Sequence, residues 1–175
     1  MADPLYRVRQ FLRAARAAPL TNEELERVRS VLDDAALALY QTMPLGDQHH
    51  SLKIFDALRA QGYDAPPLLQ AALLHDVAKR NLALGYRTGV IVLKKFSPQA
   101  LARAASDDPR SWRYPFYISL HHPELGAELA ARVGVDEGAL VLMRAHQQDT
   151  PAFTGNDAAL LTEWHHALKE LDDVN

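Results

Sequence analysis

The chain has 175 residues, 48% of them hydrophobic, which suits one domain with its own core. It contains no cysteine, which excludes a disulfide framework, a thiolate metal site and a cysteine nucleophile. Its formal net charge of −3 provides no global basic field, so we expect no nucleic acid polymer as partner.

No apolar run reaches the roughly 18–20 residues that a membrane span needs, and no signal-peptide pattern starts the chain. We therefore expect a cytoplasmic protein without a membrane partner. The oligomeric state stays open at this point.

The N-terminal part reads as helices separated by turns. Residues 4–18 have an apolar stripe at helical spacing, which predicts a short amphipathic helix. Thr21 and Glu24 form a capping box that starts a helix expected to run to about Thr42. Pro44 to Asp47 is expected to be a turn, followed by a helix from about Gln48 to Gln61.

The next segment organises the whole chain. Pro66 and Pro67 start a helix with almost no polar face, which predicts burial on most sides. This helix ends in His75 and Asp76, and an unpaired ionised carboxylate in a core costs several kcal/mol. A divalent metal removes that cost, because neutral imidazole and carboxylate are both good ligands. A hydrogen-bonded His–Asp pair at a helix end is the alternative.

The region from residue 80 to residue 113 has the weakest pattern. Residues 90–93 resemble a strand by propensity, but a lone strand would have no partner, so we predict helix. Ser97 and Pro98 start a short helix that ends near Ala105. An aromatic cluster then precedes the second histidine doublet, either to pack or to line a ligand pocket; it consists of Trp112, Tyr114, Phe116 and Tyr117.

Three further helices are expected in the C-terminal part. The first opens at His122 and ends at Val133, with Gly134 as its C-terminal glycine. The second covers residues 137–146, and the last covers about residues 157–173. The inward face of the last helix is expected to consist of Leu160, Leu161, Trp164, Leu168 and Leu171. One all-α domain follows, with N-terminal helices (residues 1–43) packed on residues 44–175.

Histidines and aspartates recur at helix ends or on helix faces. Eight histidines are present, and six of them form three doublets. Successive helices of a bundle can bring such residues to one place. The candidates for metal ligands are His50, His75, Asp76, His122, His146 and Asp172.

These stretches resemble the HD-domain metal-dependent phosphohydrolase superfamily. Its pattern is a histidine, a distant His-Asp doublet on a helix and a final aspartate, and it matches at residues 47–52, 72–79 and 168–175. Two more stretches, His122 to Leu129 and Met143 to Gln147, are similar to those of relatives with extra histidines. The resemblance covers about residues 47–175. It departs at Ala78, where many relatives have glycine. The Gly-Tyr-Pro motif of cyclic-di-GMP phosphodiesterases is also missing after His146.

The resemblance implies a single-domain helical bundle of HD-domain type. His50, His75, Asp76 and Asp172 would hold one metal, and His122 and His146 would hold a second or line the substrate pocket. Two assignments have rivals. His49 lies beside His50, and His165 precedes Asp172 by seven residues on nearly the same face. We prefer His50, which is followed by serine as in the family, and Asp172, which borders the apolar stripe while Asp173 turns outward.

The function implied is a metal-dependent phosphohydrolase acting on a small phosphate ester, most plausibly a nucleotide. Its cofactor would be one or two divalent ions (Mn, Fe, Co, Ni, Zn or Mg). Asp76 and Lys79 are the candidate catalytic residues, since Lys79 is one turn after His75 and is placed to neutralise phosphate charge. A solvated helix-end lysine is the alternative. Arg80, Arg87 and Arg113 are weaker phosphate-binding candidates. The rival functions are a non-catalytic nucleotide- or metal-binding signalling module and a di-iron oxygenase of HD type.

Overall fold

The computed structural model describes residues 17–81, 86, 90 and 97–174. Within these residues every regular element is helical, which confirms the expected all-α class for this part of the chain. The helices are α2 (Asn22–Arg29), α3 (Asp34–Tyr40), α4 (Leu45–Ala60), α5 (Pro66–Leu74), η1 (Val77–Asn81), α7 (Pro98–Ala104), α8 (Tyr114–Ala131), α9 (Glu137–Ala145) and α10 (Ala158–Val174). Most of each helix expected at residues 4–18 and 90–93 lies outside the described residues, as do Arg87 and Asn175.

The capping box that starts α2 is present, but the helix is shorter than expected. Thr21 accepts a hydrogen bond from the Glu24 backbone, and the Glu24 carboxylate accepts one from the Thr21 backbone. The predicted single helix to Thr42 is wrong, because helical structure is interrupted at residues 30–33. Asp33 is then the N-cap of a new helix, α3 (Asp34–Tyr40). Its carboxylate accepts from the Ala36 amide at 2.8 Å, which satisfies a donor that has no partner inside the helix.

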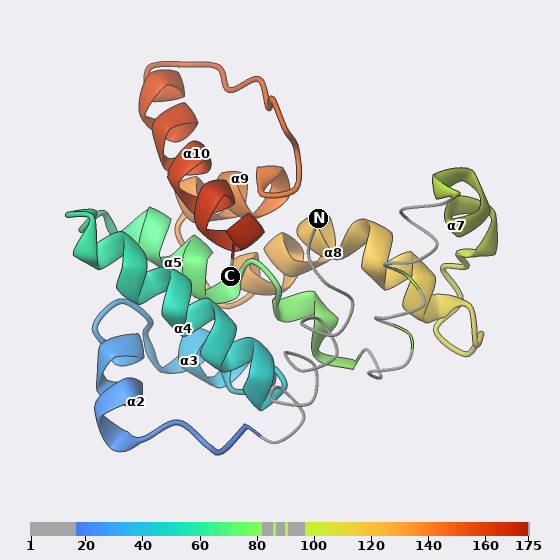
Figure 1. Ribbon diagram of the computed structural model, residues 1–175, viewed down its shortest axis with the longest axis horizontal. Helices are drawn as coiled ribbons and strands as arrows, with labels where there is room; N and C mark the ends of the chain where they lie inside the picture. Colours follow the sequence, from blue (N-terminus) through green and yellow to red (C-terminus); the bar gives the residue numbers. More distant parts are fainter. Residues whose placement is uncertain (1–16, 82–85, 87–89, 91–96, 175) are drawn as a thin grey trace.

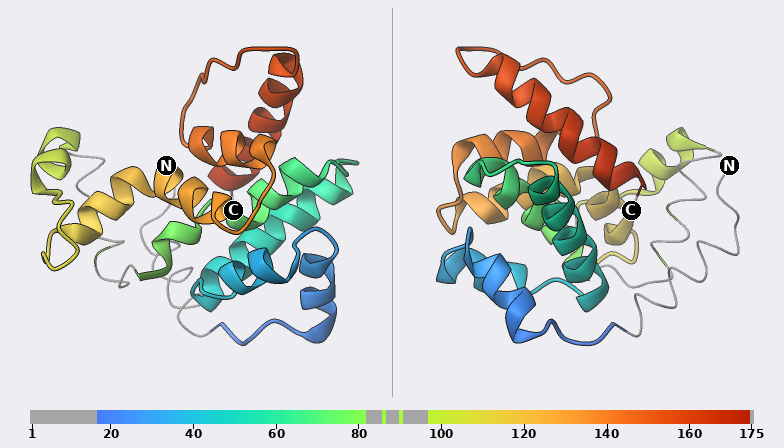
Figure 2. Two further views of the ribbon diagram at one scale, coloured as in Figure 1. Left: turned by 180° about the vertical axis from the view of Figure 1, so that it is seen from behind. Right: turned by 60° about the vertical axis from the view of Figure 1, so that its left-hand side comes forward.

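α4 and α5 form the centre of the bundle. The predicted turn at Pro44 to Asp47 is wrong, since Pro44 is the N-cap and Leu45 already belongs to α4. α5 begins at Pro66, as its proline pair predicts, and most of its side chains are fully buried. It packs against α4 and α9, and Figures 1 and 2 show it enclosed between them. The main hydrophobic cluster also includes side chains of α2 and α3, so these helices share the core.

α8 is the longest helix and links the bundle to its outlying part. It packs on α9 and η1 at one end and on α7 at the other, and Figures 1 and 2 show it extending outward from the bundle. A second, smaller hydrophobic cluster of Val90, Leu101 and Phe116 lies around its first turns. The predicted start at His122 is wrong, because the helix begins eight residues earlier and contains Pro123 in its interior.

The C-terminal helices follow the expected order. Gly134 has φ +81°, the left-handed conformation that ends a helix at little cost in glycine. In α10, Leu168 and Leu171 are buried as expected, but the expected inward position of Leu160 is wrong because its side chain is exposed. Among the described residues, no helix is long and apolar enough to cross a membrane.

Candidate metal centre

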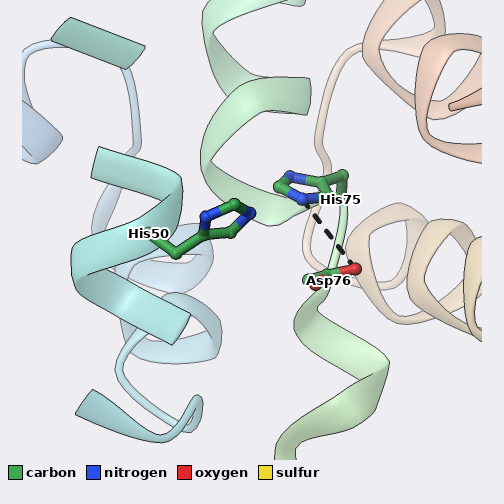
Figure 3. Close-up of side chains that lie close together, drawn as sticks. All are labelled: His50, His75 and Asp76. Atoms are coloured by element: carbon green, nitrogen blue, oxygen red, sulfur yellow. Dashed lines mark ion pairs between the residues drawn. The ribbon is translucent and has the colours of Figure 1, made fainter. Parts of the chain in front are cut away.

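The structure brings the six candidate ligands together from five parts of the bundle. His75 and Asp76 follow the last turn of the buried helix α5, which therefore delivers them into the interior. Figure 3 shows the His50 ring, from α4, reaching towards His75 and Asp76. The other three ligands come from α8, from the residue after α9 and from α10; they are His122, His146 and Asp172.

One part of the centre is partly open to solvent. His50 Nε2 lies 2.9 Å from Asp172 Oδ1, and His75 Nε2 lies 3.5 Å from the same oxygen. The side chains of His50 and Asp172 are 26% and 23% exposed, whereas His75 is fully buried. These three residues are called the open half below. Each of its imidazoles already faces a carboxylate oxygen.

The other part is closed to solvent. His122 and His146 have side chains only 1% exposed, and their Nε2 atoms are 3.2 Å apart. These two residues are called the buried half below. Both Nε2 atoms also face Asp76 Oδ1, at 3.4 and 3.8 Å.

Asp76 belongs to both halves. Its Oδ1 lies 3.8 Å from His75 Nε2, in addition to its contacts with the buried half. Two groups of three nitrogen or oxygen donors could each hold one ion: His50, His75 and Asp76, or Asp76, His122 and His146. Asp172 is a member of neither group, although it contacts His50 and His75. The spacing of the donors is therefore compatible with one ion or with two ions that share Asp76.

Lys79 is anchored on the shared carboxylate. Its Nζ lies 2.7 Å from Oδ1 and 2.9 Å from Oδ2 of Asp76. Although burial opposes it, the positive charges of Lys79 and then of His75 hold the pKa of Asp76 well below its usual range. Asp76 is therefore an anion at neutral pH, which is the form that binds metals.

Three of the histidines share one orienting contact. The Nδ1 of His75, His122 and His146 each lies 2.7–3.0 Å from the backbone carbonyl oxygen three residues earlier. A carbonyl only accepts, so each Nδ1 carries the proton, and in the neutral ring Nε2 keeps its lone pair. This is the arrangement that second-shell contacts impose on metal-binding histidines.

These carbonyls are available because they lack the usual helical donor. Those of Ala72 and Met143 lie in the last turns of α5 and α9, where carbonyls have no partner within the helix. The Ser119 carbonyl is in the middle of α8, but the residue four positions later is Pro123, which has no N–H. His122 Nδ1 donates to it instead, at 3.0 Å. Pro123 thus leaves free the carbonyl that orients His122.

The electrostatics of the buried half call for a cation. Burial and then the positive charge of Lys79 lower the pKa of His122 to about 2. Burial and then the charge of His75 lower the pKa of His146 to about 4. Both rings are therefore neutral at pH 7, with Nδ1 protonated. Two Nε2 lone pairs then face each other at 3.2 Å, an arrangement that is repulsive unless a positive ion binds to both.

The open half accommodates positive charge differently. Burial alone would lower the pKa of His75, but the carboxylates of Asp76 and Asp172 raise it to about 9. Contacts with His50 and His75 hold the pKa of Asp172 below its usual range against the effect of burial. Within the described residues, His75 Nε2 is buried without a hydrogen bond in good geometry. The chemistry of this donor set, two imidazoles and two carboxylates, fits a divalent metal.

The rival residues lie away from the centre. His49 Nε2 contacts the Ala18 carbonyl at 2.9 Å, whereas His50 Nε2 contacts Asp172. His165 is buried, but its Nε2 donates to the Ala145 carbonyl at 3.0 Å. Asp173 is exposed and pairs with Lys169 at 3.1 Å. None of the three contributes to the donor groups found in the described part of the chain.

The aromatic cluster and Arg113 have structural surroundings. Phe116 is buried in the second hydrophobic cluster, and Trp112 is 69% exposed with its ring edge-on to Phe116. The Arg113 guanidinium donates to backbone carbonyls at the end of α7, including that of Ala104 at 2.7 Å. Arg113 therefore caps the C-terminal end of α7, where a cation interacts favourably with the helix dipole.

A scan against family models and searches of curated proteins and of solved structures found no match to this chain. The centre therefore has to be interpreted from its own chemistry. Sequence reasoning missed the carbonyls that orient the rings, the Pro123 contribution and the Lys79–Asp76 pair. The proline directly after His122 was the signal for the Ser119 contact, and the three-residue spacing of Asp76 and Lys79 was the signal for their ion pair.

Proposed function

We propose that the chain binds one or two divalent transition metal ions at this centre. The observation that carries the proposal is the pair of neutral imidazoles, His122 and His146, whose unprotonated Nε2 atoms face each other and the ionised carboxylate of Asp76. His50, His75, Asp76 and Asp172 would hold one ion, and Asp76, His122 and His146 would hold another. Mixed nitrogen and oxygen donors favour Mn, Fe, Co, Ni or Zn over Mg.

We further propose that the centre hydrolyses a small phosphate ester, most plausibly a nucleotide. The resemblance of the ligand pattern to HD-domain phosphohydrolases supports this reading, as does the net charge of −3, which disfavours a polymeric nucleic acid. A bound ion would supply a water of lowered pKa and stabilise charge on the phosphoryl oxygens.

The chain's own residues would have separate tasks in this reaction. The open half is the side from which substrate would approach, since His50 and Asp172 are the exposed ligands. Asp76 would hold the metal, and Lys79 would balance the negative charge that gathers when a phosphate approaches Asp76. The buried half would stay inaccessible to substrate because its rings are closed to solvent.

The test is a metal analysis combined with a phosphatase assay. The purified chain, loaded with Mn, Co or Zn, is assayed for phosphate release from nucleotides, sugar phosphates and aryl phosphates. We expect turnover in the wild type and loss of both metal and turnover in His75→Ala. The matched control is His49→Ala, which removes the neighbour of a ligand and should keep both. Metal binding without phosphate release from any substrate would contradict the hydrolase proposal.

A non-catalytic metal-binding module is the second candidate. The enclosure of the buried half favours it, because structural metal sites are closed whereas catalytic sites keep an open position. In that case the protein would take up metal and gain stability, but would turn over neither phosphate esters nor, with reduced iron, dioxygen. Dioxygen consumption by the iron-loaded chain would instead indicate an HD-type oxygenase.

A further inference from the structure

A separate concave site lies between η1 and one side of α8. It is a pocket of about 220 Å³. Arg80 lines it from η1, while Tyr114, Glu128 and Arg132 line it from α8. Aliphatic side chains, among them Ile118, complete the wall. None of its lining residues belongs to the metal centre.

Among the described residues, the two guanidinium groups of this pocket have few partners to balance their charge. Arg80 Nη1 lies 3.4 Å from the Thr42 hydroxyl, which is a weak hydrogen bond. Within the described part of the chain, neither Arg80 nor Arg132 forms an ion pair, even though Glu128 is one turn from Arg132. Two cations therefore face one concavity, and an anion bound between them would reduce their repulsion.

The remaining lining groups narrow the class of anion. Arginine binds phosphate through paired N–H donors, so Arg80 and Arg132 suit a phosphate group. The Glu128 carboxylate accepts hydrogen bonds and repels a second anionic group, so it suits hydroxyls beside the phosphate. The volume is below the roughly 300–1,000 Å³ of pockets for drug-sized ligands, which limits the occupant to a small molecule.

The pocket is next to the metal centre along both of its walls. Ala78 and Arg80, which line it, flank Lys79, and Lys79 contacts Asp76. On α8, the lining residues Ile118 and Leu125 lie one turn before and one turn after His122. Helix neighbours at these spacings are about 5–6 Å apart.

We propose that this pocket is a phosphate-ester site, which binds a small phosphorylated molecule bearing hydroxyl groups, of about the size of a sugar phosphate. The site uses Arg80 and Arg132 for the phosphate and Glu128 for the hydroxyls. It does not depend on a metal ion, so it goes beyond the proposed function of the metal centre.

The test measures binding of ribose 5-phosphate to the full-length chain by calorimetry, with and without a chelator. We expect binding in both conditions. Arg80→Gln and Arg132→Gln should each weaken it about tenfold or more, because each removes a charge-assisted contact. Arg110→Gln is the matched control: this exposed arginine lies outside the pocket, and its loss should change the affinity less than about twofold.

Glu128→Gln and free inorganic phosphate separate the two parts of the proposal, namely binding of the phosphate by the arginines and binding of the hydroxyls by Glu128. We expect Glu128→Gln to weaken ribose 5-phosphate and to leave inorganic phosphate unchanged or bound more tightly. Equal weakening by Arg110→Gln, or no binding by the wild type, would overturn the site. Loss of binding in His146→Ala would also overturn it, because the ligand would then bind at the metal centre. Arg132→Gln is also assayed for phosphate release from an aryl phosphate, a reaction that we assign to the metal centre. This assay distinguishes a failure of the pocket proposal from a failure of the hydrolase proposal.

Discussion

The two halves of the metal centre differ in what their own contacts already satisfy. In the open half, His50 and His75 face a carboxylate oxygen of Asp172 at 2.9 and 3.5 Å, so a proton can hold the group together. In the buried half, His122 and His146 direct two lone pairs at each other at 3.2 Å, and burial keeps both rings neutral, with their single proton on Nδ1. The open half is therefore stable without a metal, whereas the buried half stores repulsion that a cation would remove.

This difference suggests separate roles for the metals of the two halves, one in chemistry and one in stability. Because His50 and Asp172 are partly exposed, a metal in the open half would be accessible from solvent, as the proposed reaction requires. The buried half consists of His122 in α8 and His146 at the end of α9, two helices that pack together. A metal bound to both would therefore contribute mainly to the stability of the fold. Asp76 couples the two, because its Oδ1 faces nitrogen atoms of both.

The largest effect is expected from Asp76→Asn, which removes the charge shared by both halves. The asparagine amide keeps the shape of the side chain but carries no charge to balance the metal ions, and Lys79 loses its ion pair with residue 76. Changes in outer-shell residues cost about 10–100-fold in metal affinity, so loss of this ligand should cost more than about 100-fold. Elemental analysis after gel filtration checks it. Asp173→Asn, an exposed aspartate one residue from a ligand, should keep the metal content of the wild type.

The second prediction tests the halves against each other through thermal unfolding. Metal at 100 times its Kd should raise the Tm of the wild type by roughly 5–10 °C. His146→Gln should lose more than half of this shift, because an amide that donates to His122 Nε2 removes the repulsion without metal. His50→Gln should keep more than half of it, since the buried half remains intact.

The comparison of the halves fails if His50→Gln loses more of the metal-induced shift than His146→Gln. The metal-free proteins provide a second readout. Without metal, His146→Gln should unfold at a temperature equal to or above that of the wild type. His50→Gln should unfold at a lower temperature, because Asp172 loses the nearer of its two histidine partners.

A smaller effect is expected from Pro123→Ala, which adjusts the buried half without touching a ligand. The new N–H would compete with His122 Nδ1 for the Ser119 carbonyl, so His122 would lose its fixed tautomer. Metal affinity should fall about tenfold. ¹⁵N NMR of the imidazole should show a mixture of tautomers at His122 only. Pro115→Ala, in the first turn of the same helix, should change neither quantity. A fixed tautomer in Pro123→Ala would contradict this role.

The smallest effect concerns His165, a buried histidine outside both halves. Burial lowers its pKa, so it binds a proton less readily in the fold than in the unfolded chain, which takes up a proton below about pH 6.5. The unfolded state then binds more protons, so the free energy of unfolding decreases as the pH falls below 6.5. One such group contributes at most about 1.4 kcal/mol at pH 5.5.

Urea unfolding at pH 7.0 and 5.5 checks this contribution. His165→Gln should retain the metal content of the wild type and should lose less stability between the two pH values. An equal loss in both proteins would show that His165 does not contribute to acid sensitivity, and a loss of metal would place it in the centre.

The sequence by itself determined those features of the fold that depend only on neighbouring residues. Thr21 and Glu24 predicted the start of α2, and Pro66 predicted the start of α5. The near-absence of a polar face predicted that α5 is buried on most sides. The doublet at the end of that apolar helix also predicted charged side chains in the interior. Each of these depends on neighbours within one or two helical turns, which a sequence displays directly.

Only the tertiary structure decided the features that depend on distant partners. Pro123 read as a helix start, but α8 continues through it because His122 satisfies the carbonyl that the proline leaves without a donor. Neighbouring residues of a helix, such as His49 and His50, differ little in sequence pattern. Their directions followed from what packs beside them: Ala18 for one and Asp172 for the other. The facing lone pairs of the buried half arise from two helices whose relative position no local pattern encodes.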